Sequence, residues 1–213
     1  KVHPLDSSAN AAVLYKSENI SFMFSQSNGF TQQREVHERI KIYNKEGYDW
    51  ATKKIYLYEG SSGATKEKVT NIKAYTYNIE GSKVEKTKLK KDGIFEEDIN
   101  DYTEVNTITM PNVQDGCVIE YIYTIASPFY EIDDIYFQKN IPINRLDVEI
   151  ATPQYLSYNT LPNLKASYFP KFTEKRVNRT MKFQNADRSG VRLSQTSFSS
   201  SQSKYFDKVM SMS

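Results

Sequence analysis

Residues 36–43 read Val36-His37-Glu38-Arg39-Ile40-Lys41-Ile42-Tyr43. In an extended chain Val36, Ile40 and Ile42 lie on one side, and the polar side chains at 37, 39 and 41 lie on the other. Alternation with a period of two is typical of a β-strand that buries one face and exposes the other. This stretch therefore predicts a half-buried strand.

The same alternation recurs along most of the chain, and Cys117–Ile125 is its most β-prone run. Asn44–Gly47 predicts a hairpin turn that leads into a return strand at Trp50–Tyr58. Helical signals are confined to a turn or two in Gly93–Asp101 and Lys204–Met212. Many short strands at a spacing of about 8–12 residues predict an all-β fold, a mainly antiparallel two-sheet β-sandwich with few short helical turns.

The composition changes after Pro153, where further prolines and a long Ser- and Gln-rich stretch appear. We therefore expect a β-sandwich domain over residues 1–153. Residues 154–213 are expected to form additional strands or the start of a second, truncated β region.

Composition bounds the class of protein. The chain has 213 residues, of which 38% are hydrophobic and 25% charged, enough to bury a large core. No apolar run is long enough for a membrane-spanning helix. The formal net charge of +2 argues against a nucleic-acid-binding protein.

Residues suited to catalysis or metal binding are few. Cys117 is the single cysteine, so no disulfide forms within the chain, and the two histidines are His3 and His37. A thiol nucleophile needs a base within hydrogen-bond reach, so a Cys117–His37 enzyme is one alternative, and a small buried hydrophobe is the favoured one. The spacing of these residues matches no zinc site, and we expect no metal, no cofactor and no catalytic residue.

Charged residues cluster in two neighbouring segments. Lysines alternate through 83–91, which is typical of an edge strand protected against aggregation and, less often, of an anion-binding strip. The acidic residues that follow favour a solvated loop over a calcium site, because they lack the Asp-x-Asp-x-Asp-Gly pattern. They are Glu96, Glu97, Asp98 and Asp101.

Tyrosine is unusually frequent, with 16 residues. Three i,i+2 pairs each share one strand face, and an aromatic platform made from them is a speculative ligand-binding site for a peptide or a glycan. Ordinary cross-strand packing is the alternative. The six residues are Tyr56, Tyr58, Tyr75, Tyr77, Tyr121 and Tyr123.

Several segments, in this order and spacing, carry a resemblance to a known family. They are Asp6–Tyr15, Arg39–Gly47, Ile72–Asn78, Pro111–Tyr121, Ser127-Pro128, Phe137-Gln138 and Ile141–Ile143. Together they resemble the β-rich domain found N-terminal to transglutaminase-like (papain-fold) domains in Bacteroidota proteins. The resemblance covers roughly residues 6–153 and continues more weakly beyond.

The absence of a catalytic constellation, the paired tyrosines and the resemblance together predict a non-catalytic binding or scaffolding module. The resemblance also implies an exported multidomain protein, periplasmic or associated with the cell surface. A first residue other than Met agrees with that expectation. The implied partner is a downstream transglutaminase-like domain or another protein, and the catalytic Cys, His and Asp of the family lie in that downstream domain. Cys117 stands where the family suggests a small residue such as Ser. A purely structural spacer is the alternative to a binding module.

Overall fold

The computed structural model describes residues 2–25, 28–60, 65–153, 156, 158–162, 173–177, 190–195 and 209–212. Within these residues the chain forms fourteen β-strands and two short 3-10 helices, η1 (Lys45–Ala51) and η2 (Lys91–Gly93). All strand pairs within the sheets are antiparallel except β1 with β10. The predicted all-β, mainly antiparallel class is confirmed.

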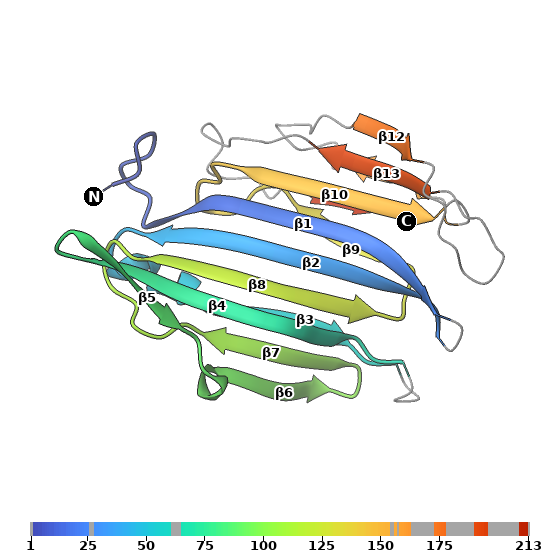
Figure 1. Cartoon of the computed structure of the whole chain (residues 1–213), viewed down its shortest axis with the longest axis horizontal. Helices are drawn as coiled ribbons and strands as arrows, with labels where there is room; N and C mark the ends of the chain where they lie inside the picture. Colours follow the sequence, from blue (N-terminus) through green and yellow to red (C-terminus); the bar gives the residue numbers. More distant parts are fainter. Residues whose placement is uncertain are drawn as a thin grey trace.

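Eight strands form one large twisted sheet, which is the nearer layer in Figure 1. Their order across the sheet differs from their order in the chain, so β1 and β2 lie at its centre. In spatial order they are β12 (Thr173–Val177), β13 (Gly190–Gln195), β10 (Leu146–Pro153), β1 (Ala11–Ser25), β2 (Gly29–Ile42), β8 (Val118–Ser127), β4 (Lys68–Glu80) and β5 (Lys83–Lys88).

Two three-stranded sheets form the second layer of the sandwich. One has the order β3 (Thr52–Tyr58), β7 (Thr103–Thr109) and β6 (Ile94–Asn100). The other has the order β11 (Thr160–Pro162), β14 (Val209–Met212) and β9 (Ile132–Tyr136). Buried residues of β3, β7 and β9 belong to the same hydrophobic cluster as those of β1, β2 and β8. The sandwich is therefore confirmed, with its second layer divided into two pieces.

The core follows the period-two pattern. Val36, Ile40 and Ile42 of β2 are buried, and their neighbours across the register on β8 include Ile119 and Tyr123. Each fully buried aliphatic side chain contributes roughly 1.5–3 kcal/mol relative to exposure. One such row on each strand fixes which side of the large sheet faces the second layer. We call that side the inner face and the opposite side the outer face.

The inner face also carries charged residues. Glu38 on β2 is fully buried and pairs with Lys53 of β3 at 2.7 Å and with Lys139, which follows β9, at 2.5 Å. Although burial alone would raise the pKa of Glu38, the two ammonium groups hold it well below its usual range. Glu38 therefore links both small sheets to the large one.

A second buried carboxylate lies on β1. Glu18 pairs with Lys16 and with Arg34 of β2, whose Nη2 lies 2.6 Å from Glu18 Oε2. Burial opposes ionisation of Glu18, but the two cations outweigh it and lower its pKa to about 2. Four cations thus surround two carboxylates on the inner face.

The structure corrects three local predictions. Asn44–Gly47 does not close a hairpin: η1 follows Asn44, and the return strand, β3, pairs with β7 in another sheet rather than with β2. The helical turn predicted at Gly93–Asp101 is wrong, because Ile94–Asn100 is strand β6. In Lys204–Met212, the last four residues are strand β14, and residues 204–208 lie outside the described residues.

Strands after Pro153 pair with strands before it. β13 pairs with β10, and β14 pairs with β9. The division of the chain at residue 153 stays a prediction. No helix among the described residues is long and apolar enough to span a membrane.

Candidate binding face of the large sheet

The three predicted tyrosine pairs lie on three different surfaces. Tyr121 and Tyr123 are buried on the inner face, where the Tyr121 hydroxyl donates to the Trp50 carbonyl oxygen at 3.1 Å. Tyr75 and Tyr77 alternate with the buried Ala74 and Thr76, so they point to the outer face. The structure therefore does not form one platform from six tyrosines.

The third pair lies on the second layer. Tyr56 and Tyr58 alternate with the buried Ile55 and Leu57, so they face away from the large sheet, and they are 58% and 48% exposed. The Tyr58 ring meets Phe129 edge-on at 5.2 Å. This pair cannot act together with Tyr75 and Tyr77, because the thickness of the sandwich separates the two surfaces.

Glu120 of β8 organises the outer face around Tyr77. Its carboxylate lies 2.7 Å from His37 Nε2, and it accepts hydrogen bonds from Arg39 Nε at 2.6 Å and the Tyr77 hydroxyl at 2.6 Å. Its side chain is only 4% exposed, because these three side chains cover it. Burial alone would raise the pKa of Glu120, yet the hydrogen bonds from Tyr77, His37 and Arg39 lower it.

Antiparallel register brings these groups together. Arg39 of β2 and Tyr75 of β4 are the direct neighbours of Glu120 on its two sides. Cross-strand neighbours have Cβ atoms about 4.5–5.5 Å apart, within reach of long side chains. A carboxylate on the middle strand therefore meets donors from both flanking strands, and it fixes the orientation of the Tyr77 ring.

Aromatic and cationic contacts extend this cluster in both directions. On one side, Lys86 Nζ of β5 lies 3.7 Å from the centre of the Tyr75 ring and 5.4 Å from that of Tyr77. On the other, the Tyr15 ring of β1 meets His37 edge-on at 5.4 Å, and the Arg145 guanidinium lies 5.5 Å from the Tyr15 ring. Cation–π contacts of this kind contribute about 0.5–1 kcal/mol at exposed sites.

These contacts form a continuous row across the large sheet, which we call the outer strip. Its side chains come from five strands and from Arg145, the residue just before β10. Rings that are held in place present rigid apolar area with polar tips, which suits them to recognition. The outer strip comprises Tyr15, His37, Arg39, Tyr75, Tyr77, Lys86, Glu120 and Arg145.

Most of this strip is not evident from the sequence. The sequence indicates Tyr75 and Tyr77 as ligand-binding candidates and Lys86 as part of a lysine run that is, less often, an anion-binding strip, but it does not indicate Glu120, the partner that orders the two tyrosines. A carboxylate within the apolar run Cys117–Ile125 was the available signal. Its significance depends on which strands flank β8, which the alternation does not reveal.

Cys117 and His37 belong to different faces of the large sheet. Cys117 is 1% exposed and packs in the hydrophobic cluster, and its burial raises the pKa of the thiol. His37 lies on the outer face against Glu120. The sheet separates the two side chains, so they do not form a catalytic pair. Among the described residues, no group of three or more His, Cys, Asp or Glu side chains is arranged to hold a metal ion.

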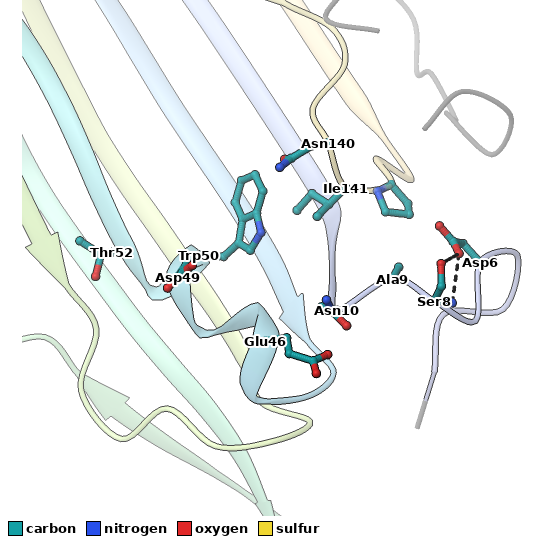
Figure 2. A pocket seen from close by; sticks show the side chains of 11 residues that line it. Asp6, Ser8, Ala9, Asn10, Glu46, Asp49, Trp50, Thr52, Asn140 and Ile141 are labelled. Atoms are coloured by element: carbon teal, nitrogen blue, oxygen red, sulfur yellow. Dashed lines mark hydrogen bonds between the residues drawn. The ribbon is translucent and has the colours of Figure 1, made fainter. Parts of the chain in front are cut away.

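A hollow of about 600 Å³ lies at one end of the sandwich, between the N-terminal segment, η1 and residues 140–142. Figure 2 shows the Trp50 indole beside Asn140 and Ile141, and Asp6 hydrogen-bonded to Ser8 at the other side. Three of its eleven lining residues are acidic, Asp6, Glu46 and Asp49, and none is basic. This lining disfavours an anionic occupant.

The fold and sequence have known counterparts. A family model described as a domain of unknown function with a solved structure (DUF3857) matches residues 29–188. The crystal structure of a putative protease from Parabacteroides distasonis is similar, with a TM-score of 0.67 and 12% sequence identity. That match covers 95% of this chain and 40% of the other, so this chain spans well under half the length of that protein.

A further structural match is weaker. A putative nutrient binding protein from Legionella pneumophila has a TM-score of 0.39 and 10% identity, and the match covers 96% of this chain and 67% of the other. This TM-score is too low to establish a shared fold. The search of curated proteins found no match. At 12% identity, the match to the Parabacteroides distasonis protein establishes the fold and no activity.

Proposed function

We propose that this chain, which belongs to the DUF3857 family, is a non-catalytic binding module that holds a partner on the outer strip. The observation that carries the proposal is the Glu120 cluster, in which one buried carboxylate is hydrogen-bonded to three side chains from the two neighbouring strands. A binding surface gains affinity when its side chains are ordered before the partner arrives, because less conformational entropy is lost on binding. The outer strip meets that condition.

The composition of the strip favours a partner with acidic or hydroxyl groups. It presents Arg39 and Lys86 together with the hydroxyl groups of tyrosines, while Glu120 is covered and Arg145 is paired with Asp147 at 2.7 Å. Extended peptides and glycans both offer suitable flat surfaces and acceptors. A neighbouring domain of the same protein satisfies the same chemistry.

The proposal places the module within a longer, exported protein, periplasmic or at the cell surface, and next to a transglutaminase-like domain. Support for a longer protein comes from the structural match, in which this fold accounts for 40% of the other chain. Support for the transglutaminase-like neighbour comes from the sequence segments described above. A purely structural spacer would not need an ordered outer strip.

The test compares two tyrosine pairs on opposite surfaces. The chain is screened on peptide and glycan arrays, and the strongest hit is titrated by calorimetry against Tyr75→Ala/Tyr77→Ala and the matched control Tyr56→Ala/Tyr58→Ala. Loss of one anchoring aromatic typically costs 2 kcal/mol or more, so we expect the first pair to weaken binding roughly 30-fold or more. The control pair should bind like the unchanged chain. Equal weakening by both pairs would contradict a binding role for the outer strip, and the absence of a hit on either array would contradict a peptide or a glycan as its partner.

A further inference from the structure

Two edge strands of opposite charge lie on the same side of the molecule. Among the described strands, β5 ends the large sheet and β6 ends the β3-β7-β6 sheet. Only residues 89–93 connect them, so the two edges lie close together although they belong to different layers. Figure 1 shows both along the lower side of the molecule.

The charges on the two edges are complementary. β5 contributes three lysines, Lys83, Lys86 and Lys88, beside a single carboxylate, Glu85, while β6 contributes three carboxylates, Glu96, Glu97 and Asp98. The three lysines and the three carboxylates of β6 are all exposed. Within the part of the chain that the structure describes, only Lys86 among them has a recorded side-chain partner, the Tyr75 and Tyr77 rings.

Apolar side chains accompany these charges. Val84 on β5 is 67% exposed, and Phe95 and Ile99 on β6 are 58% and 52% exposed. An edge strand with free backbone groups and exposed apolar side chains is a template for pairing with another chain. β5 has 6 residues and β6 has 7, so each spans about 20 Å and the two can pair along their whole length.

Within one molecule the two edges cannot pair with each other, because they end different layers. A second copy placed against this side by a two-fold axis that runs along the strands has its two layers exchanged, so that β5 meets the partner's β6 and β6 meets the partner's β5. In Figure 1 the arrows of β5 and β6 both run toward the right, and rotation about an axis along the strands keeps that direction, so each facing pair is parallel. Such isologous contacts are the commonest way in which protein dimers form.

We propose that this chain forms a symmetric dimer in which the lysine-bearing edge β5 of each copy lies against the acidic edge β6 of the other. The charges select this arrangement: β5 against β5 sets lysines against lysines, and β6 against β6 sets carboxylates against carboxylates. Like charges placed directly opposite destabilise a strand pair, whereas opposite charges stabilise it. The lysines thus prevent open-ended association and still permit one closed pairing.

The experiment measures the mass of the whole chain in solution by sedimentation, at low salt and at about 1 M salt, where the Debye length is roughly 3 Å. We expect a dimer at low salt that dissociates at high salt. Lys83→Glu/Lys88→Glu and Glu96→Lys/Glu97→Lys should each raise the dissociation constant at least about tenfold, because two of the three charges on the altered edge then face like charges. Lys86 is left unchanged so that the outer strip stays intact.

Mixing provides the decisive result. In the variant with reversed lysines both edges are mainly acidic, and in the variant with reversed glutamates both edges are mainly basic. An equimolar mixture should therefore form a heterodimer, although neither variant dimerises alone. Lys45→Glu/Lys54→Glu, which reverses two exposed lysines on η1 and β3, is the matched control and should remain dimeric. A monomer under all conditions would overturn the proposal, as would a dimer that neither reversal weakens or a mixture that stays monomeric. None of these outcomes bears on ligand binding by the outer strip.

Discussion

Glu120 lies on the central part of the outer face, where His37, Arg39 and Tyr77 converge on its carboxylate. Hydrogen bonds to a charged group contribute about 1.5–3 kcal/mol each, roughly twice the contribution of neutral ones. A single residue therefore holds the central side chains of the outer strip in fixed orientations. The same residue links β8 to both of its neighbours, β2 and β4.

The substitution Glu120→Gln keeps the shape of the side chain and removes its charge. We expect the free energy of unfolding to fall by about 1–3 kcal/mol, because Arg39 loses its anionic partner. Urea denaturation measures the loss. Glu35→Gln is the control. It changes an exposed carboxylate of β2 that also lies on the outer face, and it should shift the midpoint of urea denaturation little. Equal effects of the two substitutions would contradict the role of Glu120.

Glu18 makes stability depend on pH in the acid range. Its pKa is about 2 in the folded chain, below the ordinary glutamate value of 4.5 that applies in the unfolded chain, so the unfolded state takes up its proton first as the pH falls. The stabilisation is therefore complete above about pH 4.5 and is lost as the pH falls toward 2. A difference of this size corresponds to about 3 kcal/mol.

Glu18→Gln tests this pH dependence. Urea denaturation is measured between about pH 5 and pH 2, the range in which Glu18 takes up its proton. Over this range the variant should lose less stability than the unchanged chain. It should also be less stable at neutral pH, because Lys16 and Arg34 remain buried without their anion. Asp134→Asn, which changes an exposed carboxylate on β9, should keep the original slope. An unchanged slope in Glu18→Gln would show that another carboxylate is responsible.

At the scale of elements, the second layer is held to the large sheet by more than apolar packing. Lys53 comes from β3 and Lys139 from the segment after β9, and both contact Glu38 of β2. Burial, together with the ammonium groups of Lys53 and Lys16, lowers the pKa of Lys139 to about 8. For Lys53, which is also buried, the attraction of Glu38 outweighs burial and raises the pKa. Glu38 thus lies where the two small sheets meet the large one.

Glu38→Gln should destabilise the chain by about 3–5 kcal/mol, because two buried ammonium groups lose their shared carboxylate. Hydrogen exchange should accelerate in β3 and β9 more than in β1. The triple variant Glu38→Leu/Lys53→Met/Lys139→Met should recover most of the stability, since an apolar replacement leaves no buried charge unpaired. Failure of the triple variant to recover would mean that the site depends on its shape rather than its charge.

For the whole molecule, the described buried core lies between Ala11 and Ile150. Removal of residues 154–213 should therefore leave a chain that still unfolds cooperatively, as the predicted boundary at 153 requires. It should be less stable and more prone to association, because β10 and β9 lose their partners β13 and β14. Urea denaturation and light scattering measure both effects. A truncated chain without a cooperative transition would contradict a domain that ends at residue 153.

Much of the fold was predictable because its signal is local. Val36, Ile40 and Ile42 alternate with polar residues, and burial follows that alternation directly. The η1 segment was not predictable in this way, because a hairpin turn and a 3-10 helix use similar residues, and the difference lies in where the next strand pairs. Tyr121 and Tyr77 belong to similar i,i+2 pairs, and only one pair faces outward.

The amino-acid sequence by itself determined that this chain is a β-sandwich and which side of each regular strand is apolar, because the side chains of a strand alternate with a period of two. Only the tertiary structure decided which strands are neighbours, since pairing joins residues far apart in the chain. Glu120 and Tyr77 are 43 positions apart, and Glu38 and Lys139 are 101 apart. Contacts at such separations arise from register and topology, so the outer strip and the divided second layer became visible only in three dimensions.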